Sequence, residues 1–66
     1  MNIPMLRGKM VEKGYTVETL AAELCMDRAT LYRKLNDAEK FTIGEAKKIK
    51  NILDLTDEEA CIIFLL

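Results

Sequence analysis

Residues 14–36 read GYTVETLAAELCMDRATLYRKLN and carry the most informative structural pattern of the chain. Leucines recur in it at helical spacing twice, first as Leu20 and Leu24 and then as Leu31 and Leu35. Between the two expected helices, only Cys25, Met26 and Asp27 are left to turn the chain. Two helices joined by so short a turn must cross steeply, as they do in a helix-turn-helix unit. The stretch therefore predicts two crossed helices that face each other through their leucines.

Helix starts are marked along the chain by an apolar residue, then a capping side chain, and then a core-facing residue four positions into the helix. The side-chain oxygen of such a residue accepts an otherwise unpaired N–H of the first helical turn. The positions of this kind are Thr16, Asp27, Thr42 and Thr56. Glu45 and Glu59 stand three residues after the last two of them and complete capping boxes. An earlier helix begins near Pro4, because proline suits a first turn, and ends before Gly14, a natural left-handed stop.

These starts, and the apolar spacing that follows them, predict an all-helical (all-α) chain. The expected helices span residues 4–13, 17–24, 28–35, 43–53 and 57–65. No linker, low-complexity run or repeat of solenoid length interrupts them. We therefore expect residues 1–66 to form one compact five-helix domain that contains a helix-turn-helix. A core of this size gives a net stability of only roughly 3–5 kcal/mol, so tight packing or a dimer interface is also expected.

The net charge of −1 is unevenly distributed along the chain. All ten basic residues lie in residues 1–53, which carry a net charge of +3, whereas residues 54–66 carry −4. One region of the surface can therefore be positive while another is negative. This distribution permits nucleic-acid binding without requiring it.

The composition argues against a metal site, a cofactor and an enzyme. The chain has no histidine, and its two cysteines, Cys25 and Cys61, lack the spacing of metal ligands. Both cysteines are expected as small apolar side chains in or near the core of a cytoplasmic protein. No signal peptide is recognised, and the apolar residues 60–66 are far fewer than the ~20 of a membrane span. With no nucleophile–base pair and little room for a cleft, neither catalytic residues nor a small-molecule effector are expected.

The third expected helix carries a polar face opposite its leucines. At about 100° per residue, the residues on that face are Ala29, Arg33 and Asn36, flanked by Arg28 and Tyr32. An arginine fork matches the two acceptors on a guanine edge, and alanine can contact a thymine methyl group. Asparagine can bond to a phosphate or to an adenine. The face therefore favours contact with the major groove of double-stranded DNA.

The charged and aromatic side chains of this helix are also compatible with a purely structural role. Lys34 and the arginines beside it can form a solvated helical face, and Tyr32 can pack against a neighbouring helix. The lysines of the fourth expected helix are assigned to a solvated face rather than to DNA contact. They are Lys47, Lys48 and Lys50.

The stretch 14–36 resembles the helix-turn-helix of the phage Cro and repressor group of bacterial DNA-binding proteins. The residues that match the family pattern are Thr16, Leu20, Ala21, Leu24, Asp27 and Leu31. The resemblance implies a lambda-repressor-like fold whose third helix reads the major groove. The residues implied to read base edges are Arg28, Ala29, Tyr32 and Arg33. The residues implied to contact phosphate are Thr16, Val17, Thr19, Asn36 and Thr42.

Three places depart from the family pattern. Cys25 stands where glycine is usual, so its backbone must shift or become left-handed at a cost of about 1–2 kcal/mol. Val17 replaces a polar side chain and removes one potential contact. Met10 and Leu35 occupy the places where many members pair an arginine with a glutamate. An apolar contact between them is a reasonable replacement for a buried ion pair.

The last expected helix is more apolar than the burial of one face requires. The residues that suit the core are Ala60, Ile63 and Phe64, and those left for exposure are Ile62, Leu65 and Leu66. An uncovered apolar patch on so small a protein suggests a partner. The resemblance implies that this partner is a second copy, which gives a homodimer on a pseudo-palindromic site. The alternative is a terminus folded wholly into the core.

The sequence thus predicts specific binding of double-stranded DNA by a transcriptional regulator, repressor-like and of phage, prophage or bacterial origin. The alternative is a protein-interaction helix bundle, antitoxin-like or anti-repressor in role, with weak or no DNA binding.

Overall fold

The computed structural model describes residues 1–36 and 40–64. The helices are α1 (Ile3–Glu12), α2 (Val17–Glu23), α3 (Arg28–Leu35), α4 (Ile43–Ile52) and α5 (Asp57–Phe64). Across the described residues there are five helices and no strand, so the all-α prediction is confirmed. Each observed boundary lies within one residue of its predicted place. None of these helices is long and apolar enough to cross a membrane.

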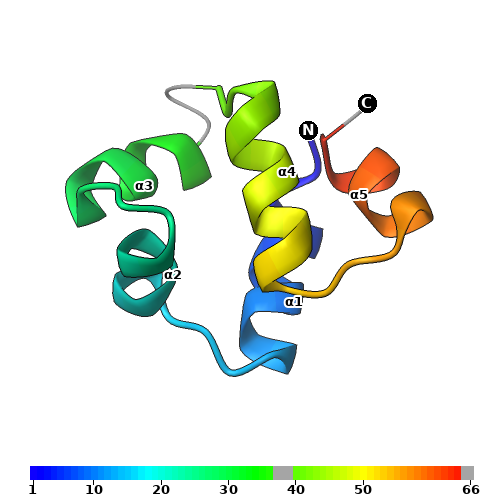
Figure 1. Ribbon diagram of the computed structural model, residues 1–66, viewed down its shortest axis with the longest axis horizontal. Coiled ribbons are helices and arrows are strands. Elements are labelled where there is room, and N and C mark those ends of the chain that lie inside the picture. Colours follow the sequence, from blue (N-terminus) through cyan, green and yellow to red (C-terminus); the bar gives the residue numbers. More distant parts are fainter. Residues whose placement is uncertain (37–39, 65–66) are drawn as a thin grey trace.

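The helices are arranged around α4, which crosses in front of α1 (Figure 1). The pair α2 and α3 lies on one side of α4 and α5 lies on the other (Figure 1). Helices α2 and α3 pack closely on each other, and α5 packs on both α1 and α4. The backbone N–H of Asn2 donates to the carbonyl of Ile63 at 2.7 Å, which ties the beginning of α1 to α5.

Side chains from all the helices meet in a single core cluster. The largest fully buried ones are Leu6, Leu20, Leu31, Leu35, Ile49, Leu53 and Ile63. Each buried side chain of this size contributes about 1.5–3 kcal/mol relative to exposure. Met10 and Leu35, which depart from the family pattern, are both in the cluster and are 4% and 2% exposed. The expected burial of apolar side chains at these two positions is therefore confirmed. The predicted core face of α5 is confirmed as well, because Ala60, Ile63 and Phe64 are all buried.

Capping boxes begin three of the helices. The hydroxyls of Thr42 and Thr56 accept the N–H groups of Glu45 and Glu59, whose carboxylates accept the threonine N–H groups in return. Both predicted boxes are therefore confirmed.

The sequence did not predict the capping partner of Thr16 or the cap of α1. Thr16 forms its box with Thr19, because the hydroxyl of each accepts the backbone N–H of the other. Asn2 caps α1 by accepting the N–H of Met5 at 3.1 Å.

The predicted side-chain cap at Asp27 is wrong. Its backbone is extended, as an N-cap requires, and its carbonyl accepts the N–H of Leu31 at 3.0 Å. Its carboxylate makes no capping bond, and nothing in the structure explains why.

Left-handed backbone appears at the predicted turns. Gly14, after α1, has a φ of 79°, and Cys25, between α2 and α3, has a φ of 54°. A third left-handed residue, Asp54, has a φ of 52° and follows α4. The turn from α2 to α3 therefore keeps its left-handed geometry although a side chain occupies it.

The prediction that both cysteines lie in or near the core is wrong, because both are exposed. Cys25 is exposed in the left-handed turn between α2 and α3, so it does not join the leucines of those helices in the core. Cys61 follows the buried Ala60 on α5 and is exposed in a groove that it lines with residues of α4.

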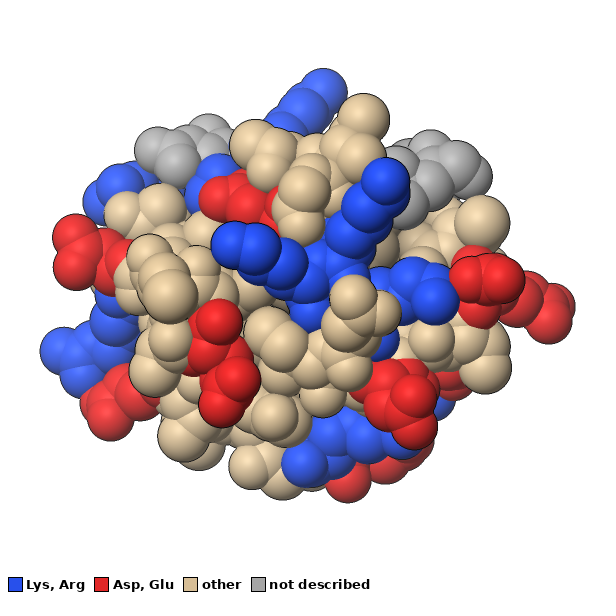
Figure 2. Space-filling model, in the orientation of Figure 1, with Lys and Arg blue, Asp and Glu red and all other residues tan. Residues whose placement is uncertain are grey.

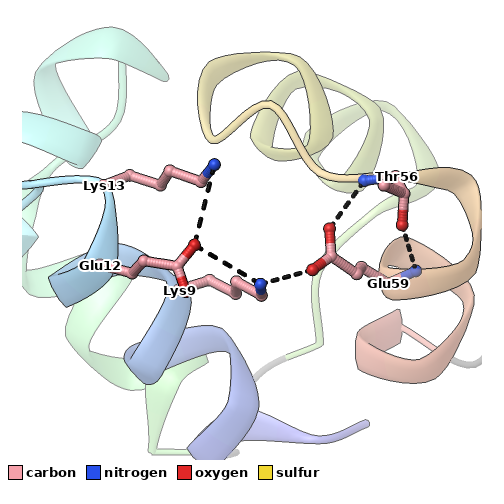
Figure 3. Close-up of polar contacts among 5 residues, drawn as sticks. All are labelled: Lys9, Glu12, Lys13, Thr56 and Glu59. Carbon is pink, nitrogen blue, oxygen red and sulfur yellow. Dashed lines mark hydrogen bonds and ion pairs between the residues drawn. The ribbon is translucent and has the colours of Figure 1, made fainter.

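A polar cluster joins α1 to the start of α5 (Figure 3). The Lys9 ammonium lies between the carboxylates of Glu12 and Glu59, and Lys13 also pairs with Glu12 (Figure 3). One oxygen of Glu59 pairs with Lys9 while the other accepts the N–H of Thr56 at 2.9 Å. The bond from Lys9, followed by that from the Thr56 amide, lowers the pKa of Glu59 to about 2. The bond to Glu59 raises the pKa of Lys9 above its usual 10.5.

This cluster predicts a pH dependence of folding stability. A carboxyl group whose pKa is lower in the folded state stabilises that state when the pH is above its unfolded-state pKa. This stabilisation is lost as the pH falls through the folded-state pKa. The free energy of unfolding should therefore decline between pH 4.5 and about 2 as Glu59 becomes protonated. The ion pair that raises the pKa of Lys9 stabilises the folded state below pH 10.5, and this stabilisation is lost as the pH rises above that value. Denaturant unfolding followed by circular dichroism across the acid range measures the decline.

Two variants with the same change of charge isolate this effect. Glu59→Gln should be less stable at neutral pH and should show a shallower acid decline than the parent protein. Its exposed neighbour supplies the control, since Glu58→Gln should keep the full decline. Equal acid declines in the two variants would show that Glu59 does not stabilise the fold in this way.

Candidate nucleic-acid interface

Helix α3 is buried on one side and exposed on the other, as predicted. Leu31 and Leu35 are 0% and 2% exposed. The exposed residues of α3 and its C-cap are Arg28, Ala29, Tyr32, Arg33 and Asn36. The four predicted base-reading residues therefore share the outward surface of one helix.

Arg28 and Arg33 are both held by neighbouring side chains. Arg28 pairs with Glu18 of α2, and these two side chains are 61% and 69% exposed. An ion pair so exposed is worth less than about 1 kcal/mol, so a stronger acceptor can displace it. Arg33 donates to the hydroxyl of Thr30 at 3.1 Å, one turn earlier on the helix. Both guanidinium groups are thus exposed and already have a hydrogen-bonding partner on the protein.

Tyr32 remains half-exposed beside the arginines. Its exposed fraction is 46%, so the ring is not sequestered against a neighbouring helix. Nearly half of the residue's surface is therefore accessible to a ligand.

Lys34 does not belong to this face, and the solvated position suggested for it is wrong. The residue is 7% exposed, and its ammonium donates to the carbonyl of Lys40 at 2.9 Å. It also lies 3.2 Å from a carboxylate oxygen of Glu45 and 5.8 Å from the centre of the Phe41 ring. Partial burial raises the pKa of Glu45, but the Thr42 amide and the Lys34 ammonium outweigh it, so the net direction is downward. Lys34 thus joins the end of α3 to the start of α4.

The predicted phosphate-contacting residues lie at helix ends. Thr16 and Thr19 are exposed at the start of α2, and the hydroxyl of each already accepts a hydrogen bond from the backbone N–H of the other. The Val17 side chain is partly buried against the core, which leaves only its backbone for such a contact. Thr42 is exposed and caps α4, and Asn36 is exposed at the end of α3.

Basic side chains gather over the middle of α4, with acidic ones around them (Figure 2). Lys47 and Lys48 are exposed, whereas Lys50 pairs with Asp57 of α5 at 3.0 Å. The face is mixed in charge, so electrostatics alone do not define a nucleic-acid surface.

Exposed apolar side chains lie apart from the core. Ile62 on α5 is 46% exposed, as predicted. Leu65 and Leu66, the other two predicted interface residues, lie outside the described residues. Two exposed side chains were not foreseen, because Val11 on α1 is 78% exposed and Ile43 on α4 is 66% exposed.

Comparisons of the chain with protein-family models, curated proteins and solved structures find no match.

Proposed function

We propose that this chain binds double-stranded DNA through a helix-turn-helix formed by α2 and α3, with α3 in the major groove. The observation that carries the proposal is the outward surface of α3. It presents Arg28, Ala29, Tyr32 and Arg33 together, opposite two fully buried leucines. An arginine, a small apolar side chain and a hydrogen-bonding aromatic are suited to the acceptors and methyl groups on base edges. The resemblance of residues 14–36 to the phage Cro and repressor group supports the same assignment.

The other proposed contacts between the protein and the duplex are made to phosphates. Thr16, Thr19 and Asn36 are exposed at the helix ends, where hydroxyl, amide and backbone N–H donors suit phosphate oxygens. Val17 contributes through its backbone, and Thr42 contributes a further contact at the start of α4. Such contacts fix the protein's register on the duplex but carry no sequence information.

More particularly, we propose a repressor-like transcriptional regulator of phage, prophage or bacterial origin that acts as a homodimer. Ile62 on the outer side of α5 supports an interface there, and the apolar Leu65 and Leu66 follow it in the sequence. Two recognition helices about 34 Å apart read a palindrome better than one helix reads a single half-site.

Selection from a random pool of duplexes tests this function. We expect enrichment of one sequence family with two inverted half-sites whose centres lie about one helical turn, ~10 base pairs, apart. Enrichment of single half-sites would support readout by α3 and contradict the dimer. Recovery of unenriched sequences would contradict specific readout.

A protein-interaction helix bundle, antitoxin-like or anti-repressor in role, is the second candidate. The strongly exposed apolar side chains of Val11, Ile43 and Ile62 favour it, since exposed apolar surface on a small protein is typical of a partner-binding site. An unenriched pool would favour this second candidate over the first.

A further inference from the structure

Arg7 on α1 lies beside the end of the proposed recognition helix. Its Nη2 atom donates to Oδ1 of Asn36 at 3.4 Å, although the two residues are 29 positions apart. Arg7 is exposed, and Asn36 is the exposed C-cap of α3. The first helix thus reaches a residue that is proposed to contact phosphate.

Arg7 differs from the other basic residues of α1 and its C-cap in its ionic partners. Lys9 and Lys13, the neighbouring bases, both pair with carboxylates. Within residues 1–36 and 40–64, no carboxylate lies within ion-pair distance of Arg7. A guanidinium has five N–H donors in a fixed plane, and the bond to Asn36 uses one of them. With respect to the described part of the chain, the group therefore keeps both its charge and most of its donors available.

A groove connects Arg7 with the beginning of α2. It is open to solvent, has a volume of about 240 Å³, and is lined by Arg7, Met10, Val11, Tyr15, Thr16 and Val17. Arg7 thus shares this groove with Thr16 and also contacts Asn36. Thr16 and Asn36 are the proposed phosphate contacts at the start of α2 and at the end of α3.

The bond from Arg7 also orients the Asn36 side chain. Because a guanidinium only donates, it must face the carboxamide oxygen of Asn36. The amide nitrogen, which donates two hydrogen bonds, then points away from Arg7. A phosphate oxygen placed beside the two residues would meet donors from both.

We propose that Arg7 contacts a phosphate of the bound duplex from α1 and holds Asn36 for a second contact to the same strand. This inference rests on the proposed DNA binding and adds α1 to the interface. Arginine suits the role because its planar fork binds two phosphate oxygens at once. The contact is to the backbone, so it is independent of base sequence.

The test compares two variants that each remove one positive charge. Arg7→Gln removes the proposed contact, and Lys48→Gln removes an exposed lysine of α4. Fluorescence anisotropy with a labelled random-sequence duplex, at several salt concentrations, gives the dissociation constant and its salt dependence. Arg7→Gln should bind several-fold more weakly than Lys48→Gln, and the slope of log affinity against log salt should fall by about 0.9. A second measurement on the unaltered chain follows the Arg7 Nε–H resonance by NMR, which should shift when the duplex is added.

The outcomes separate this inference from the function on which it rests. If the unaltered chain binds the duplex, but Arg7→Gln keeps its salt slope or the Arg7 resonance does not move, the contact from α1 is overturned and DNA binding stands. If the unaltered chain does not bind the duplex at any salt concentration, the proposed function and this inference both fail. If Arg7→Gln loses its helical circular dichroism, the NMR shift of the unaltered chain decides alone.

Discussion

Replacing Arg33 with alanine is expected to weaken binding to the selected site by about 1–3 kcal/mol, with the loss confined to one base pair in each half-site. Arg33 lies on the exposed face of α3, and Thr30 already orients its guanidinium. A fork that donates two hydrogen bonds to a guanine edge discriminates against the other bases, which do not present two acceptors there. Without the fork, the variant should tolerate substitutions at that base pair.

Two control variants separate base readout from general attraction to DNA. Arg33→Lys keeps the charge but loses the planar fork, so it should lose most of the base preference while retaining its salt dependence. Lys47→Ala removes an exposed charge on α4 and should leave the preference intact. Repeating the pool selection with each variant measures the preference position by position. A uniform loss of affinity across all sequences in Arg33→Ala would identify Arg33 as a phosphate contact instead.

The helical framework was predictable because its signals are local. A hydroxyl followed three residues later by a glutamate identified the starts of α4 and α5, since both partners of each capping box lie in one turn. The same search missed the box of Thr16 and Thr19, because a second hydroxyl plays the part of the glutamate there. The exposed face of α3 also followed from spacing alone, because burial of Leu31 and Leu35 fixes the rotation of the helix.

Side chains whose position depends on tertiary contacts were harder to predict. Lys34 follows Leu31 by three positions and so lies on the buried side of α3, a spacing that could have revealed its burial. Its partners, Glu45 and the carbonyl of Lys40, belong to a segment that only the fold brings near. The cysteines were misplaced for a related reason, since a general preference for burial cannot say which side of a turn or helix faces the core. The contact between Arg7 and Asn36 joins residues 29 positions apart, and no local pattern marks it.

The packing of α1 predicts the largest effect on stability. Met10→Ala is expected to destabilise the fold by about 2–5 kcal/mol, the range for removing a buried methionine side chain. Met10 is 4% exposed and belongs to the core cluster. Because a domain of this size has a net stability of roughly 3–5 kcal/mol, the variant should be partly or wholly unfolded at room temperature. Thermal and urea unfolding followed by circular dichroism measure the change.

The next residue of α1 provides a matched control for this substitution. Val11 is 78% exposed, so Val11→Ala should alter stability by no more than about 0.5 kcal/mol. A double-mutant cycle with Leu35→Ala, in the presence of a stabilising osmolyte, then tests the contact expected between Met10 and Leu35. Residues in contact give coupling energies of about 0.5–3 kcal/mol. Strictly additive losses would show that the two side chains are buried separately, and that an apolar contact has not replaced the ion pair implied by the resemblance.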